Sequence, residues 1–84
     1  MKDVIKYPLS TEKSIRLMES ENKLIFVVQR KATRNDVKES IEKLFNAKID
    51  KVNVYTDVKG EKRAYVKFKD ETPAIDIATQ LGLM

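Results

Sequence analysis

Residues 49–69, which read IDKVNVYTDVKGEKRAYVKFK, decide the fold because they contain two strand patterns joined by a tight turn. In both arms apolar residues alternate with polar ones, as side chains do on the two faces of a β-strand. The pattern predicts strands over 49–58 and 61–69, with Gly60 supplying the positive φ of the turn. A hairpin makes the sheet at least partly antiparallel, so the chain is expected to be an α+β domain.

The segment 23–29 predicts a second kind of strand. Its centre, Leu24–Val28, is a continuous apolar run rich in β-branched residues. Such a run without alternation indicates a central strand covered on both faces. Residues 4–7 predict a short strand that Pro8 ends, because proline cannot donate to a ladder.

The first of three expected helices follows this short strand. Ser10 or Thr11 is expected to cap it, and it should run to about Glu19. Ile15 and Met18 stand three residues apart and are predicted to face the core.

The other two helices follow the run at 24–28 and the hairpin. Thr33 is expected to cap the second, with Asp36 completing a variant of the capping box. Its predicted buried stripe is Val37, Ile41, Leu44 and Phe45. Thr72 and Pro73 are expected to cap and begin the third helix. The whole chain, residues 1–84, is thus predicted to be one domain: a mainly antiparallel four-stranded sheet packed with three helices, its strand order open.

Composition excludes several classes of function. The chain has no cysteine and no histidine, so neither a disulfide nor a common zinc site is expected, and acid–base catalysis would rest on carboxylates, lysine or tyrosine. We therefore expect no metal, no cofactor and no enzyme. No apolar run approaches a membrane span of roughly 20 residues, so we expect a cytoplasmic protein without a membrane partner. The net charge of +4 favours a polyanionic partner, although a lysine-rich soluble surface explains it equally well.

The polar face of the hairpin is the first candidate site. If the apolar residues share the core, the other face carries Lys51, Asn53, Tyr55, Arg63, Tyr65 and Lys67. Cations interleaved with aromatic rings suit RNA, because the cations neutralise phosphates and the rings stack on bases. An ordinary solvated sheet face, or one partly covered by a helix, would have the same pattern.

A second basic cluster surrounds the start of the second helix. It comprises Arg30, Lys31, Arg34 and Lys38, with Thr33 as a further candidate. Free backbone N–H groups at a helix start could bind phosphate together with these cations. A charged loop around a helix cap is the alternative interpretation.

The hairpin turn is a third, separate candidate. Lys59 and Lys62 make it a basic tip that could enter a groove of a nucleic acid. An ordinary surface turn would have the same residues.

The corner at Ser10, Thr11, Glu12 and Lys13 places a carboxylate and an amine side by side on the surface. Helix capping explains the first three of these residues fully, and nothing in their chemistry requires a partner.

Several motifs occur in an order that is similar to a known family. They are PLSTEK at 8–13, NKLIFVV at 22–28, ATR at 32–34, IEKLF at 41–45, KVNV at 51–54, RAYVKF at 63–68 and AIDIATQLGL at 74–83. Together they resemble the ribosomal protein L23 family of the large subunit. The last motif resembles archaeal and eukaryotic members, and together with the short hairpin loop it indicates an archaeal protein, since bacterial members carry a longer loop.

The resemblance implies a structural ribosomal protein, monomeric within the ribosome, that binds large-subunit ribosomal RNA beside the polypeptide exit tunnel. It also implies contacts with neighbouring ribosomal proteins and a docking site for signal recognition particle or other nascent-chain factors. The hairpin and the start of the second helix correspond to RNA-binding regions, and residues 10–13 correspond to the factor-docking segment. The rival interpretation is a small α+β regulatory or protein-interaction domain that binds a metabolite or another chain.

Overall fold

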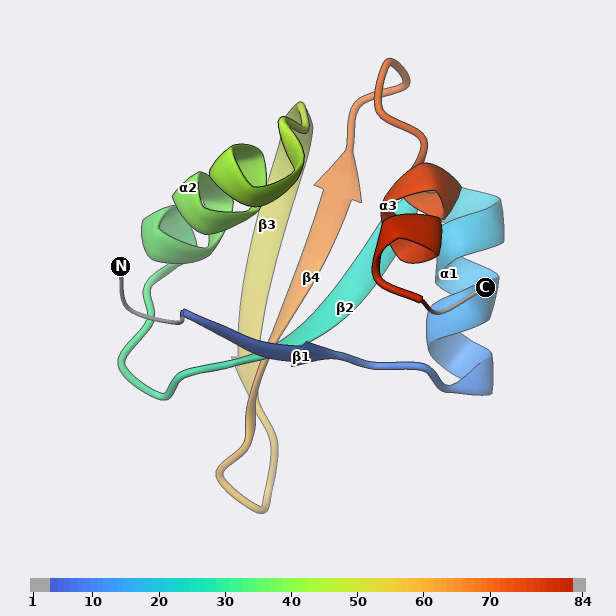
Figure 1. Ribbon diagram of the computed structural model, residues 1–84. Coiled ribbons are helices and arrows are strands. Elements are labelled where there is room, and N and C mark those ends of the chain that lie inside the picture. Colours follow the sequence, from blue (N-terminus) through green and yellow to red (C-terminus); the bar gives the residue numbers. More distant parts are fainter. Residues whose placement is uncertain (1–3, 83–84) are drawn as a thin grey trace.

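A computed structural model describes residues 4–82 and contains the predicted elements in the predicted order (Figure 1). They are β1 (Ile5–Pro8), α1 (Glu12–Glu21), β2 (Lys23–Val28), α2 (Arg34–Phe45), β3 (Ile49–Thr56), β4 (Lys62–Phe68) and α3 (Ala74–Gln80). The α+β class and the hairpin between β3 and β4 are confirmed, and Gly60 has the expected positive φ of 84°.

The four strands form one sheet in the order β1-β2-β4-β3, and every neighbouring pair is antiparallel. β2 and β4 are therefore the inner strands. The apolar run of Leu24–Val28 is buried throughout, and both α1 and α3 contact β2. The second arm of the hairpin, β4, inserts between β2 and β3. Because of this order, one polar position from each of β2, β4 and β3 lies in a single row on one face of the sheet.

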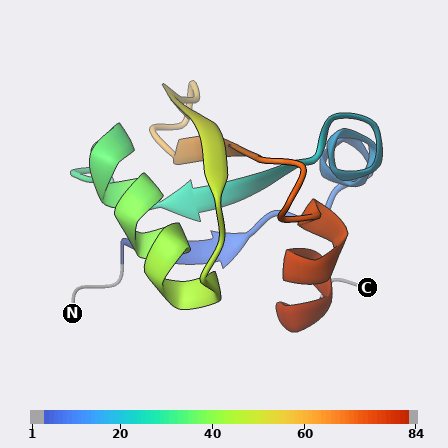
Figure 2. The same ribbon diagram turned by 90° about the horizontal axis from the view of Figure 1, so that it is seen from above.

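Helices α2 and α3 lie over the same face of the sheet (Figures 1 and 2). The hydrophobic core fills the space between these helices and the sheet, with Phe26, Val66 and Phe68 from the strands and Val37 and Ile41 from α2. Helix α1 packs beside β2 and α3. The opposite face of β4 and β3 is not covered by a helix of the described residues. None of the helices formed by residues 4–82 is long and apolar enough to cross a bilayer.

The cap of α1 is one of the two predicted residues. Thr11, and not Ser10, is the cap, and it forms a capping box with Ser14. Because this box turns Ser14 inward, the buried face of α1 passes through Ser14 and Met18. Ile15 lies beside that face and is 38% exposed, so the prediction that it faces the core was wrong.

The predicted stripe of α2 is correct except in its last turn. The capping box between Thr33 and Asp36 is present, and Val37 and Ile41 are fully buried. Phe45 packs against the core from the last turn, whereas Leu44 points outward and is 55% exposed. The prediction that Leu44 is buried was therefore wrong.

The start of α3 is held by a residue from elsewhere in the chain. Pro73 precedes the helix without any side-chain cap, and the hydroxyl of Thr72 instead accepts a hydrogen bond from the N–H of Lys48 at 3.0 Å. The predicted cap at Thr72 was wrong. Its place is taken by Asn22, whose Oδ1 accepts a hydrogen bond from the N–H of Ala74 at 2.6 Å.

Candidate nucleic-acid interface

A row of three lysines crosses the helix-free face of the sheet. In the strand register, Lys67 of β4 pairs with Lys23 of β2 on one side and with Lys51 of β3 on the other. Side chains at paired positions of neighbouring strands point to the same face and lie close together. We call this the lysine row.

The lysine row lowers the stability of the isolated domain. Like charges on directly opposed strand positions destabilise a sheet, and the row contains two such pairs. Among residues 4–82 the row has one carboxylate partner, Glu21, which forms an ion pair with Lys23 at 3.0 Å. Lys51 and Lys67 therefore carry uncompensated positive charge, which a polyanion would neutralise.

The next positions along these strands carry aromatic side chains. Tyr65 pairs with Asn53, and Tyr55 lies two residues beyond Asn53 on the same face. The rings of Tyr55 and Tyr65 meet edge to face, with centroids 5.4 Å apart and an angle of 87° between planes. The Nζ atom of Lys13, from α1, lies 5.6 Å from the centroid of the Tyr65 ring, within cation–π range.

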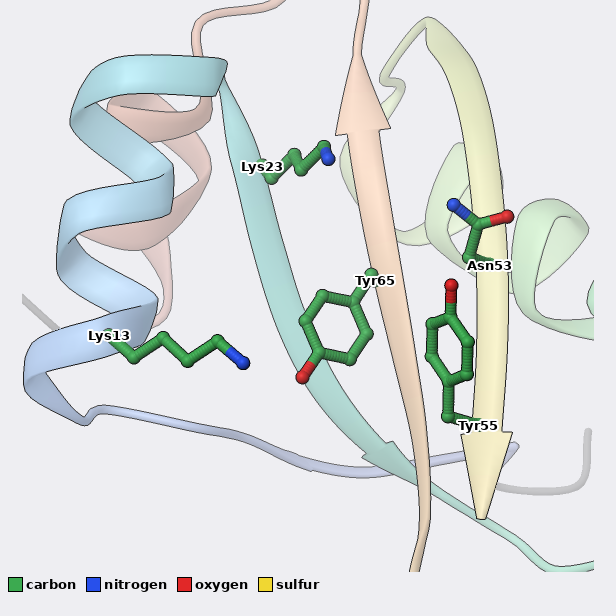
Figure 3. A pocket seen from close by; sticks show the side chains of 5 residues that line it. All are labelled: Lys13, Lys23, Asn53, Tyr55 and Tyr65. Atoms are coloured by element: carbon green, nitrogen blue, oxygen red, sulfur yellow. The ribbon is translucent and has the colours of Figure 1, made fainter. Parts of the chain in front are cut away.

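These residues surround a hollow of about 380 Å³ on the helix-free face (Figure 3). Its lining residues are Lys13, Lys23, Asn53, Tyr55 and Tyr65. Lys13 and Lys23 extend into it from α1 and β2, while Asn53 and Tyr55 come from β3. We call it the tyrosine hollow. It combines two cations, two aromatic rings and one amide, a set of groups suited to a nucleotide.

Arg63 lies on the same face, but its charge is already paired. Its Nε donates to Glu61 at 3.0 Å, and its Nη2 lies 3.7 Å from Asp57. The hydrogen bond to Glu61 raises the pKa of the guanidinium further above its ordinary value. Tyr7 of β1 donates to the other oxygen of Glu61 at 3.1 Å, and this bond raises the pKa of the phenol. Glu61 therefore ties the hairpin turn to β1. Arg63 is held by Glu61 and Asp57 within the hairpin, so it is less available to a ligand than the lysine row is.

The basic loop before α2 and the hairpin turn meet at one end of the sheet. Arg30 donates from Nε to the carbonyl of Gly60 at 3.5 Å, and Lys62 donates from Nζ to the carbonyl of Arg30 at 3.2 Å. Lys59, in the turn, and Lys31, in the loop, are exposed nearby in the chain. The structure thus brings together residues of two clusters that were separate in the sequence.

The start of α2 lies beside the edge of the sheet that β3 forms. Arg34, Lys38 and Lys51 line a hollow of about 230 Å³, which Asp50 also borders. Lys51 therefore links the lysine row to the cations of α2. Thr33 is occupied as the helix cap, because its hydroxyl accepts a hydrogen bond from the N–H of Asp36 at 3.1 Å.

In the structure the residues of the corner at 10–13 have different surroundings. Glu12 is exposed and pairs with Arg16 of the next helical turn at 2.7 Å, while Thr11 caps the helix. Lys13 turns the other way, into the tyrosine hollow. Sequence reasoning missed Lys13 and Lys23 as members of the sheet face. Lys23 has the same strand parity as Ile25 and Val27, but its neighbours could be known only from the strand order.

The fold and this face define a small α+β domain with a basic, tyrosine-bearing sheet surface. Comparison with known proteins agrees with the motifs. The sequence model of ribosomal protein L23 matches residues 3–75. The chain is 51% identical over 81 residues to large ribosomal subunit protein uL23 of Methanococcus vannielii, which covers 96% of the chain and 94% of that protein. The chain belongs to the ribosomal protein L23 family, and the similarity to an archaeal member agrees with its short hairpin loop.

Proposed function

We propose that this protein is a structural constituent of the large ribosomal subunit and binds large-subunit ribosomal RNA through its helix-free sheet face. The observation that carries the proposal is the lysine row of Lys23, Lys67 and Lys51. Three cations placed in register reduce the stability of the free domain, and the phosphates of an RNA would remove that cost. Membership of a ribosomal protein family supports the same conclusion.

Binding would be mainly electrostatic. The lysine row and the cations at the start of α2, Arg34 and Lys38, would neutralise phosphates and release their counterions. Arg30, Lys31, Lys59 and Lys62, at one end of the sheet, would extend the contact along the RNA. Tyr55, Tyr65 and Asn53 would add stacking and hydrogen bonds. Arg63 and Thr33 would act mainly by holding the hairpin and α2 in place.

We further propose that the outward start of α1 docks factors that meet nascent chains, such as signal recognition particle. This rests on the correspondence of residues 10–13 with the family's docking segment. Ser10, Thr11 and Glu12 are exposed, and Glu12 carries its carboxylate on the surface beside Arg16. The protein would then work as a monomer in the cytoplasmic ribosome, among neighbouring ribosomal proteins and near the exit tunnel. It would have no catalytic activity.

A salt-titrated binding assay tests the RNA proposal. It compares a large-subunit RNA fragment from the tunnel-exit region with an unrelated structured RNA of equal length. If about six phosphates are contacted, log affinity should fall with log salt with a slope of about −4 to −5. Equal, weak binding to both RNAs would favour a small protein-interaction domain instead.

A further inference from the structure

We propose that the tyrosine hollow holds one unpaired nucleotide of the bound RNA, with its base stacked on Tyr55 and its phosphate between Lys13 and Lys23. This inference rests on the proposed RNA binding and deepens it. The lysine row alone would suit the backbone of any RNA, whereas the hollow requires a base that has left its helix.

The two tyrosine rings form a corner that matches a planar base. Because their planes meet at 87°, a base lying flat on one ring presents its edge to the other, in the edge-to-face geometry that aromatic groups prefer. Tyr65 is half-buried and has Lys13 over its ring, so it forms a fixed wall. Tyr55 is 58% exposed, which leaves its ring surface available for stacking.

The two lysines and the asparagine amide of the hollow lie on opposite sides of the corner formed by the tyrosine rings. Lys13 and Lys23 reach the hollow from α1 and β2, and Asn53 reaches it from β3 (Figure 3). Among the described residues Lys13 has no carboxylate partner, so its ammonium is free to bind a phosphate. Lys23 pairs with Glu21 at 3.0 Å, so Lys13 would be the main cation for the phosphate and Lys23 would share its charge between Glu21 and the phosphate. The Asn53 amide can both donate to and accept from a base edge.

The hollow is an open depression with room for a small ligand. Its volume of about 380 Å³ is at the lower end of the range of roughly 300–1,000 Å³ found for small-ligand pockets. In an RNA duplex the bases are stacked on one another and their flat faces cannot reach an aromatic ring, whereas unpaired bases can be turned out and stacked on one. The hollow therefore selects bulges, loops or single strands over continuous duplex.

A pair of variants at Tyr55 tests the stacking contact in the intact protein. Tyr55→Leu keeps an apolar side chain but removes the ring, and Tyr55→Phe keeps the ring as the matched control. Against the large-subunit RNA fragment, we expect Tyr55→Leu to weaken binding by roughly 5- to 150-fold with an unchanged salt slope. Tyr55→Phe should bind like the wild type. Equal affinities of Tyr55→Leu and Tyr55→Phe would overturn the inference while leaving the proposed RNA binding intact.

A second measurement uses simple probes and does not depend on a ribosomal fragment. Nuclear magnetic resonance would follow the ring signals of Tyr55 and Tyr65 during titration with single-stranded oligouridylate, a blunt RNA duplex of equal length, and uridine monophosphate. Larger shifts with the single strand than with the duplex would support the inference. Equal shifts with duplex and single strand would overturn it, and so would uridine monophosphate binding as tightly as the oligonucleotide, which would indicate a free-nucleotide site.

Discussion

The side-chain oxygen of Asn22 accepts a hydrogen bond from the N–H of Ala74 at 2.6 Å, so Asn22 caps a helix that begins 52 residues later in the chain. Its Nδ2 also donates to the carbonyls of Phe68 and Thr72, each at 3.1 Å. The backbone of Asn22 is left-handed, with φ of 56°, and ends α1. One residue therefore joins the end of α1, the start of β2 and the start of α3.

Replacing Asn22 should destabilise the domain more than replacing Asn46, its matched control. Both residues are left-handed helix ends, but among the described residues no hydrogen bond of the Asn46 side chain is found. Asn46→Ala should cost about 1–2 kcal/mol of unfolding free energy for the left-handed backbone. Asn22→Ala should cost about 2–4 kcal/mol, since it also leaves partly buried backbone groups of Phe68, Thr72 and Ala74 without this partner. Chemical denaturation would measure both, and equal losses would show that the Asn22 side chain contributes nothing.

Local signals account for what the sequence predicted well. The capping box of Thr33 and Asp36 and the positive φ of Gly60 depend on neighbours within a few residues, and the burial of Leu24–Val28 was indicated by its continuous apolar composition. The alternation of the hairpin also placed its polar residues on one face correctly. These features follow from backbone geometry and side-chain periodicity.

Contacts between distant segments account for what the sequence did not predict. The strand order places Lys23 beside Lys67, and the packing of α1 places Lys13 over Tyr65. Neither neighbour is visible from spacing along the chain. The capping of α3 by Asn22 is equally non-local, and for that reason Thr72 was the natural but wrong choice.

Removing two members of the lysine row should weaken RNA binding without weakening the fold. Lys51→Ala with Lys67→Ala should reduce the magnitude of the salt slope by about 1.5, the loss of two phosphate contacts. Thermal stability should be unchanged or higher, because like-charged neighbours are removed. Lys6→Ala with Lys43→Ala removes the same charge from exposed positions outside both hollows. Equal slopes for the two double variants would contradict a specific role for the row.

Neighbouring residues at the start of α1 should have separate roles. Lys13→Ala removes a cation from the tyrosine hollow and should weaken RNA binding, with a smaller salt slope. Glu12→Ala removes only the exposed pair with Arg16, so RNA affinity should stay at the wild-type level. Electrophoretic mobility shifts at several salt concentrations would compare the two variants. If Glu12→Ala impaired RNA binding as strongly as Lys13→Ala, the separate roles assigned to these two residues would be wrong.

The contact between Tyr7 and Glu61 should be visible in a pH titration. The pKa of the Tyr7 phenol is raised above its ordinary 10.0, first because the phenol donates a hydrogen bond to Glu61. The folded state thus holds this proton more tightly than the unfolded state does. The resulting stability is present below pH 10.0 and is lost as pH rises through the folded pKa. Glu61→Ala removes the acceptor and should lower the Tyr7 pKa toward 10.0, as followed by the ring resonance of isotope-labelled tyrosine. An unchanged midpoint would contradict the assigned cause.

The surface that contacts RNA can be mapped directly. Backbone amide shifts of the full chain would be recorded while the large-subunit RNA fragment from the tunnel-exit region is added. We expect the largest changes at the lysine row and the tyrosine hollow, on β2, β4 and β3, with little change at the outer surfaces of α2 and α3 around Leu44 and Ile75. Changes confined to the outer surfaces of α2 and α3, with the lysine row unaffected, would contradict the proposed interface.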